Sequence, residues 1–584
     1  MTIIKSVELI PSQKFSKILV WTGILTTLAI NPWFAFDPIN LPKMLVLSTG
    51  AFFLMSLLIF TRISFGKSHI PILIWSATLL LTLVVSYFSN ESPWYQQLWG
   101  TWGRSTGLIT YTSFILVMLG AYFLSSSNSL GQVRVSFDRL GYFMSFYVLI
   151  QLMEIDPINW SQKLMIGTLG NLNFMSSFLG MTSVSYTSRI FLEKLNASAK
   201  VFYLFLTTLN LYLILVSQSI QGVGVYFAGL TILLTFYIRK KVNLISSLGL
   251  LFVSVSVGIL VLLGSAGIGP LSLLKQSTVL FRLDYWQSGI NMIVAHPLNG
   301  IGIDSYGDFY REFRTLEAVE RTGPQRVTNT AHNIFLDIST GSGIFAGVAF
   351  GALMLLTMKS IFGGLKHRVT NIDFQVFSAL CVGFVFFCLI SINQIGIGVW
   401  GFIFMGLVSG FVFRSEAVSA SEGKPRKSVL NRNGQGNNSK LREMSLQSSK
   451  IFMGSALKVG ASGLIALAIF MIALIPNLAD ARFLAAVRAS DLEQAIEVIG
   501  KPGIQDFHVE QLMTKLRESG RDRETLGLAL TLSQSNPQNW QAWVQIAKSP
   551  VASRDQRRNA TLNLLRLDPK NNLVRLELES ELLP

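Results

Sequence analysis

The feature that most constrains this chain is a series of apolar runs, each roughly 18–25 residues long and separated by short polar breaks. A helix of that length rises far enough to cross about 30 Å of hydrocarbon. Half of the 584 residues are hydrophobic and only 14% are charged, compared with about 25% in soluble domains. The sequence therefore predicts an all-α, polytopic transmembrane bundle of about 12–13 spans, near 16–36, 43–61, 70–88, 106–124, 139–153, 164–187, 201–217, 220–238, 243–264, 333–357, 373–394, 396–413 and 452–476.

The placement of the positive charges predicts the orientation of the bundle. If the spans alternate, most basic residues fall on one side, including Lys5, Lys14, Lys17, Arg62, Lys67, Arg134, Arg139, Arg189, Lys194, Lys200, Arg239, Lys240, Lys241, Lys359, Lys366 and Arg368. The opposite short breaks hold only Lys43, Arg104 and Lys163. Basic residues accumulate on the cytoplasmic side of membrane proteins. We therefore expect a cytoplasmic N-terminus and an outside C-terminus. The net charge of +16 follows from this topology and needs no nucleic-acid partner.

The chain divides into four predicted parts. Residues 1–414 form the main bundle, with one large outer loop at 265–331. Residues 415–451 are polar and basic, which favours a flexible cytoplasmic linker. A last span at 452–476 then leads to an outside helical region at 477–584.

The C-terminal region contains two related segments. "NPQNWQAWVQIA" and "DPKNNLVRLELES" share a turn, a proline and a helical pattern, and they lie about 32 residues apart. This spacing resembles tetratricopeptide-type repeats. The region is either a small helical cap or a docking surface for a protein partner.

Polar stretches from distant parts of the chain share the predicted outer face: the glycine-containing segments at 99–111, 167–180, 217–225 and 281–309, and the pair His332-Asn333. Polar groups at membrane depth are costly unless they line a cavity or have partners. We therefore expect a water-accessible site open to the outside. The candidate substrate-binding residues on this face are Arg104, Asn171, Asn173, Gln218, Gln221, Arg326 and Asn333.

The residue types in these stretches indicate an anionic ligand. Arginine and amide donors suit phosphate oxygens, and no His/Asp/Glu set has metal-ligand spacing, so no metal or cofactor is expected. His332 is predicted at a helix N-terminus, where the helix dipole disfavours imidazolium. A neutral imidazole there accepts a proton from a hydroxyl. Asp337 lies five residues later, off the same helical face, and is not expected to orient His332.

These motifs carry a family resemblance. "RLDYW", "HPLNGIG" and "AHNIFLDISTGSGIFAG" occur in this order at 282–347, and "GTLGNLNF" precedes them at 167–174. Together they resemble the core signature of the O-antigen ligase and O-antigen polymerase superfamily over roughly 95–360, with the multi-span frame extending to about 414.

The resemblance implies a function. Superfamily members transfer glycans from undecaprenyl pyrophosphate to an acceptor on the outer face of the bacterial cytoplasmic membrane, without a metal, on an all-helical membrane fold. Arg282 would engage the pyrophosphate, and His332 would activate or orient the acceptor. Many members have Ser-Arg-Gly between the seventh and eighth spans, whereas this chain has "SQSIQG". Gln221 supplies no charge there, so a second pyrophosphate-binding arginine is left open between Arg104 and Arg326.

We therefore predict an inverting glycan ligase in the membrane, with catalytic Arg282 and His332 and a lipid-, glycan- or protein-type acceptor. A repeat-unit polymerase or a protein O-glycosyltransferase are alternatives of the same class. A saccharide exporter is the alternative from another class, but it predicts a two-fold internal repeat around a midplane site. A scaffold that uses only the C-terminal helices does not explain Arg282 and His332 together.

Overall fold

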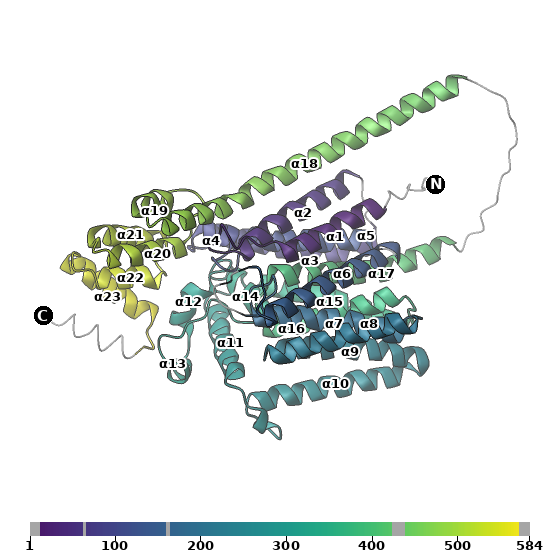
Figure 1. Cartoon of the computed structure of the whole chain (residues 1–584), viewed down its shortest axis with the longest axis horizontal. Coiled ribbons are helices and arrows are strands. Elements are labelled where there is room, and N and C mark those ends of the chain that lie inside the picture. The colour runs from purple at the N-terminus through teal and green to yellow at the C-terminus, as the bar shows by residue number, and fades with distance from the viewer. Residues whose placement is uncertain are drawn as a thin grey trace.

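The computed structural model describes residues 12–61, 66–125, 127–158, 160, 164–422 and 438–571. In these ranges every regular element is helical, which confirms the all-α class (Figure 1). Eight helices are long and apolar enough to cross a membrane, at Asn40–Phe60, Lys67–Ser89, Ala197–Val216, Ile220–Lys241, Leu244–Ser265, Ile344–Lys366, Ile372–Ile390 and Ala456–Arg488. The chain is therefore a polytopic helical membrane protein. The orientation, with a cytoplasmic N-terminus and an outside C-terminus, stays a prediction.

Each remaining predicted span also corresponds to a helix. Two are shorter apolar helices, α5 (Leu108–Leu124) and the first part of α17 (Ile395–Glu422). The other three, α1 (Ser12–Leu28), α6 (Ser127–Leu152) and α7 (Leu172–Leu192), are shorter or more polar than the eight. A charged side chain of α6 faces other helices: Arg134 is buried against Asp373 at 2.9 Å and Glu193 at 2.8 Å.

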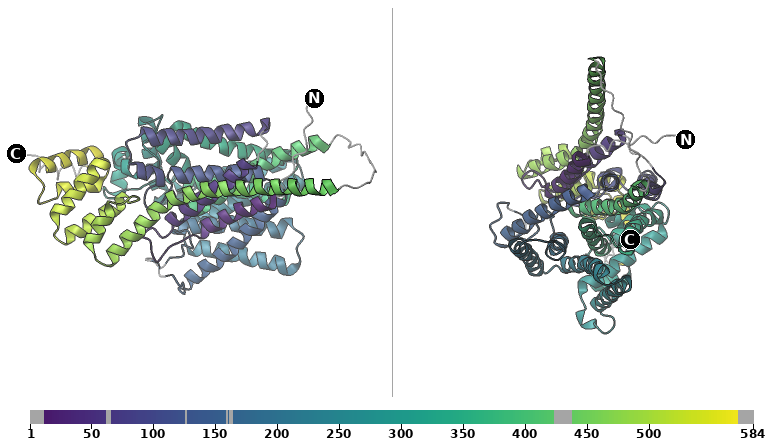
Figure 2. Two further views of the ribbon diagram at one scale, coloured as in Figure 1. Left: turned by 90° about the horizontal axis from the view of Figure 1, so that it is seen from above. Right: turned by 90° about the vertical axis from the view of Figure 1, so that its right-hand side faces the viewer.

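The bundle helices run side by side along the long axis of the molecule (Figures 1 and 2). They are α1, α2 (Asn40–Phe60), α3 (Ile70–Ser89), α5, α6, α7, α8 (Ala197–Val216), α9 (Ile220–Lys241), α10 (Leu244–Ser265), α15 (Ile344–Lys366), α16 (Ile372–Ile390), α17 and α18 (Asn438–Arg488). Aromatic side chains fill the centre. Phe114 of α5 stacks on Phe402 of α17 with ring centroids 4.8 Å apart, and Trp400 is fully buried. This packing holds the ends of the helices in register.

One end of the bundle carries the predicted outer loop and the C-terminal helices, and we call it the loop end (Figure 1). The loop is helical, with η2 (Ser272–Leu274), α11 (Ser277–Ala295), α12 (Tyr306–Phe313) and α13 (Leu316–Thr322). The short helix α4 (Trp94–Trp99) lies at the same end. The C-terminal helices there are α19 (Leu492–Ile499), α20 (Asp506–Glu518), α21 (Asp522–Ser535), α22 (Trp540–Ala547) and α23 (Arg554–Leu567).

The predicted span at 333–357 is two helices. Helix α14 (Ile334–Ser342) ends at Gly343, and α15 begins at Ile344. Gly343 has a φ of +82°, and a Cβ there would lie 2.0 Å from the carbonyl oxygen of Leu298. Only glycine accepts that backbone without strain. The break lets α14 form part of the loop end while α15 crosses the bundle.

The last predicted span is part of a longer helix. Helix α18 begins at Asn438 and runs without interruption past Pro476 to Arg488. The predicted linker at 415–451 is therefore helical at both ends, in the last turns of α17 and the first turns of α18. Its residues 423–437 lie outside the described residues, as do Lys5, Arg62, Lys163 and the repeat-like segment beyond residue 571.

The C-terminal helices are bonded to the loop end of the bundle. Asp480 of α18 accepts hydrogen bonds from the backbone N–H of Phe36 and Asp37 and from Trp102 Nε1, and it lies 3.0 Å from His508 Nε2. The Trp102 ring stacks on Phe507 at 3.5 Å. Because Asp480 and His508 are buried at this contact, the C-terminal helices pack closely against the loop end.

Candidate functional site

Arg282 and His332 approach each other at the loop end, although they are far apart in the sequence. Helix α11 carries Arg282 and, one turn later, Tyr285, whose ring stacks on His332 with centroids 5.6 Å apart and planes 27° apart. Burial, together with the positive charges of Arg282 and Arg104, lowers the pKa of His332 to about 4. The imidazole is therefore neutral at pH 7.

Arg282 is a half-buried cation without an anionic partner. Among the described residues no hydrogen bond or ion pair involves its guanidinium, and burial lowers its pKa from the ordinary value. A desolvated guanidinium gains most from a bidentate anion such as phosphate. Arg282 can therefore receive a phosphate group beside His332.

His332 stands on a strained turn directly before the N-cap of α14, at the helix start where it was expected. Its φ is +53°, and its N–H donates to Thr330 Oγ1 at 3.1 Å. The N-cap of α14 is Asn333, whose side-chain oxygen accepts from the N–H groups of Phe335 and Leu336. A non-glycine residue in this conformation persists only where its surroundings hold it.

Asp337 holds the turn before His332 through Thr330 and Ala331, and the prediction that it does not itself orient His332 stays a prediction. Its carboxylate accepts from Thr330 Oγ1 at 2.6 Å and from the N–H of Ala331 at 2.8 Å. The prediction assumed that His332 and Asp337 lie on one helix and therefore on different faces. The chain turns back at residues 330–333 instead, which places Asp337 under the residues that precede His332.

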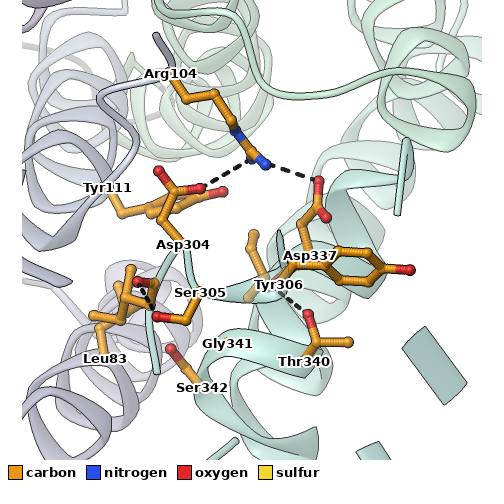
Figure 3. A pocket seen from close by; sticks show the side chains of 12 residues that line it. Leu83, Arg104, Tyr111, Asp304, Ser305, Tyr306, Asp337, Thr340, Gly341 and Ser342 are labelled. Carbon is orange, nitrogen blue, oxygen red and sulfur yellow. Dashed lines mark hydrogen bonds and ion pairs between the residues drawn. The ribbon is translucent and has the colours of Figure 1, made fainter. Parts of the chain in front are cut away.

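Arg104 is neutralised by two carboxylates and is not an open ligand-binding group (Figure 3). Its Nη2 lies 3.2 Å from Asp304 and 3.8 Å from Asp337, and its Nη1 donates to the carbonyl of Asn329 at 2.5 Å. The cavity beside it is only ≈ 10 Å³, about the size of one water molecule. The structure thus gives no room for a substrate at this arginine.

Gln221 and Asn333, two predicted site residues, meet at the end of α16. Gln221 Nε2 donates to the carbonyl of Ile390 at 3.3 Å, and Asn333 Nδ2 donates to the carbonyl of Leu389 at 3.2 Å. Among the described residues the Gln221 Oε1 atom is buried without a hydrogen bond. Gln221 and Asn333 thus bind neighbouring carbonyls at the end of α16.

The predicted pair at the start of α7 makes helix contacts. Asn171 caps α7 by accepting from the N–H of Asn173 at 2.8 Å, and Asn173 Oδ1 accepts from Ser219 Oγ at 2.8 Å. Gln218 lies in the adjoining turn, exposed, with a φ of +56°. These residues join α7 to the α8–α9 turn.

The remaining loop arginines divide into two groups. Arg326 is exposed, and its guanidinium lies 4.6 Å from the ring centroid of Phe281, next to Arg282 in the chain. Arg321 pairs with Asp284 at 3.0 Å, and Arg314 pairs with Asp568. Like Arg282, Arg326 has no carboxylate partner among the residues that the structure describes.

Sequence reasoning missed Tyr285 and Asp304 as parts of this site. Tyr285 belongs to the "RLDYW" motif, and its spacing of three from Arg282 on a helix is the signal that could have found it. Asp304 follows "HPLNGIG", but a single carboxylate in a loop carries no local signal of its partner. Among the described residues no group of His, Cys, Asp and Glu could hold a metal ion.

Comparison with known proteins supports one family. Residues 203–351 match the family model described as O-antigen ligase, and this range runs from α8 into α15 and includes Arg282 and His332. No curated protein matches the chain. This segment is therefore similar to O-antigen ligases, which supports a membrane enzyme of the O-antigen ligase or polymerase type.

Proposed function

We propose that this protein transfers a glycan from a polyprenyl pyrophosphate donor, of the undecaprenyl type, to an acceptor hydroxyl on the outer face of a bacterial cytoplasmic membrane. The loop end then faces the outside. The observation that carries the proposal is the half-buried, unpaired Arg282 beside the neutral His332, within a segment similar to O-antigen ligases.

Arg282 is proposed to hold the pyrophosphate and to stabilise its charge as the donor bond breaks. The acceptor oxygen forms a bond to the anomeric carbon of the sugar while the bond from that carbon to the pyrophosphate oxygen breaks. The electron pair leaves with the pyrophosphate, so negative charge grows next to the guanidinium. Fixed donors in a dry site stabilise such charge more strongly than water does. Arg326, also without a carboxylate, is placed to extend this anion site.

His332 is proposed to accept the proton of the incoming hydroxyl. Its pKa of about 4 makes it neutral but weakly basic in the free protein, because burial and two arginines disfavour the imidazolium. A bound pyrophosphate would offset the charge of Arg282 and raise the pKa of His332. The donor thus improves the base that the acceptor needs, and displacement in one step inverts the anomeric configuration.

The direct test uses the full chain in membranes with an undecaprenyl-pyrophosphate-linked saccharide. His332→Ala and Arg282→Ala should each lower transfer by about 10²-fold or more at normal protein levels. The matched controls are His296→Ala, whose ring packs against Phe309 and Phe313, and Arg321→Gln, whose charge Asp284 already neutralises. Both controls should keep most of the activity. Full activity of His332→Ala and Arg282→Ala would refute the proposal.

The acceptor is assigned by product analysis. A ligase attaches a finished glycan to another molecule, a polymerase lengthens the lipid-linked glycan, and a protein O-glycosyltransferase modifies a polypeptide. A tetratricopeptide-like surface on α19–α23 would serve a protein acceptor or partner. The length and attachment of the product from the wild-type chain separate these three reactions. A chain that moves saccharide across vesicles without forming a glycosidic bond would be an exporter.

A further inference from the structure

We infer that Arg104 is a positioning residue that holds His332 in place, and that it is not a ligand of the pyrophosphate. The inference rests on the proposed function, because it assumes that His332 acts in glycan transfer. It concerns the turn at 329–332, which joins α13 to α14 and presents the imidazole.

Both terminal nitrogens of the Arg104 guanidinium contact protein oxygens, while its Nε is buried and has no hydrogen-bond partner among the described residues. Its side chain is 5% exposed, and it contacts Asp304, Asp337 and the carbonyl of Asn329. The two carboxylates beside Arg104 neutralise its charge, so this guanidinium attracts a phosphate group less than an unpaired one does. Figure 3 shows the guanidinium lying between these two carboxylates. Arg282 has no such partner among the described residues. We therefore assign anion binding to Arg282 and positioning to Arg104.

Asp304 holds both the Arg104 side chain and the chain segment around Arg104. Its Oδ2 accepts from the N–H of Thr101 at 2.8 Å and from Thr106 Oγ1 at 3.0 Å, while its Oδ1 contacts Arg104. The residues that surround Arg104 in the chain are therefore tied to the same carboxylate that Arg104 binds. Arg104 cannot turn away without losing its ion pairs with Asp304 and Asp337 and its hydrogen bond to Asn329.

A short series of contacts connects Arg104 to His332. Arg104 touches Asp337, Asp337 accepts from Thr330 Oγ1 and from the N–H of Ala331, and Thr330 Oγ1 accepts from the N–H of His332. Arg104 also holds the carbonyl of Asn329 directly. These contacts restrain every residue from 329 to 332. They explain how His332 keeps a φ of +53°, a conformation that costs energy unless it is held.

The test measures donor KM and kcat separately in the full chain, with the undecaprenyl-pyrophosphate-linked saccharide as substrate. Arg104→Gln and Asp337→Asn should each lower kcat at least about tenfold and leave the donor KM within about twofold. The double variant should be no slower than the slower single variant, because both changes release the same turn. Arg104→Lys should recover part of kcat, since it keeps the charge but not the planar fork.

A milder variant keeps the inference testable if the loss of a buried charge prevents folding. Thr330→Val removes only the hydroxyl between Asp337 and the N–H of His332, and it should show the same loss of kcat at unchanged donor KM. The matched control is Arg134→Gln, which removes a similarly buried and paired arginine at the other end of the bundle. It should reproduce any general effect of losing a buried ion pair without the selective loss of kcat.

Each contrary result has a definite meaning. A rise of donor KM of tenfold or more in Arg104→Gln, with kcat unchanged, would make Arg104 a pyrophosphate ligand and overturn the inference. Wild-type kinetics of Thr330→Val and Arg104→Gln would overturn it as well. In both cases an inactive His332→Ala leaves the proposed function standing. Full activity of His332→Ala refutes the proposed function itself.

Discussion

Arg314 and Asp568 lie 254 positions apart and form a buried ion pair. Both oxygens of Asp568 accept from Arg314 Nη2, at 2.8 and 2.6 Å, and the two side chains are 1% and 0% exposed. Arg311 adds a contact to the same carboxylate at 3.2 Å. Arg314 also donates to the carbonyls of Pro324 and Arg326. The C-terminal helices thus stabilise the loop that carries Arg326.

Asp568→Asn should therefore destabilise the loop end. The change leaves two buried guanidinium groups without their carboxylate, which costs about 3–5 kcal/mol in comparable pairs. We expect a lower thermal midpoint and faster proteolysis between α12 and α14. Asp555→Asn, an exposed change on the same helix α23, is the control and should leave both measurements unchanged. Equal midpoints for the two variants would contradict the docking role.

Docking of the C-terminal helices should weaken as pH rises through about 7. Asp308 on α12 and Glu510 on α20 lie near Asp506, and burial raises the pKa of each carboxyl to about 7, from 3.8 and 4.5. A raised pKa means that the docked state keeps protons which the open state releases. The stabilisation is complete below about pH 4 and is lost as pH rises to about 7.

The measurement is the thermal midpoint of wild type and Asp308→Asn at pH 5.5 and pH 8. The variant carries a permanently neutral amide, so the difference between the two proteins should grow in its favour at pH 8. Gln96 Nε2 donates to Asp308 Oδ2 at 2.9 Å, and in the variant the side-chain oxygen of the new asparagine accepts this hydrogen bond instead. A pH-independent difference would show that Asp308 stays ionised when docked.

In the free protein, the low pKa of His332 should let glycan transfer continue to an unusually low pH before activity falls. Its pKa of about 4 leaves the imidazole neutral at every pH above about 5, whereas an ordinary value of 6.5 would protonate it near pH 6. We expect kcat/KM for the donor to stay constant from pH 7.5 to about 5 and to fall near pH 4. The limit in kcat should lie at higher pH, because a bound pyrophosphate raises the pKa of His332. A limit near 6.5 in kcat/KM would contradict this assignment.

Gly343→Ala should destabilise the break between α14 and α15. The new Cβ would lie 2.0 Å from the Leu298 carbonyl oxygen on a backbone with a φ of +82°. Strain of this kind costs on the order of 1–3 kcal/mol. Gly351→Ala is the control within α15, because nothing lies within 4 Å of its added Cβ and alanine favours a helix. The yield and thermal midpoint of the two variants should move in opposite directions.

The sequence by itself determined the fold class and the main pair of candidate residues. Apolar length decides which segments become helices across a membrane, because a backbone in hydrocarbon must satisfy its hydrogen bonds within the segment. Each predicted span has its helix for that local reason. The order of the motifs then singled out Arg282 and His332, which α11 and the turn before α14 bring to one place.

Only the tertiary structure decided what each charged group contacts. The partner of a buried charge comes from distant segments: Asp304 lies 200 residues from Arg104 in the chain, and Asp568 lies 254 positions from Arg314. No periodicity in the sequence records such a pairing, since the pairing depends on how helices pack. Arg104 and Arg282 look alike as outer-face arginines. Packing places two carboxylates beside Arg104. It leaves Arg282 without a carboxylate partner among the described residues, next to a neutral imidazole. A desolvated charge is costly without a partner, so Arg282 gains most from a bound anion.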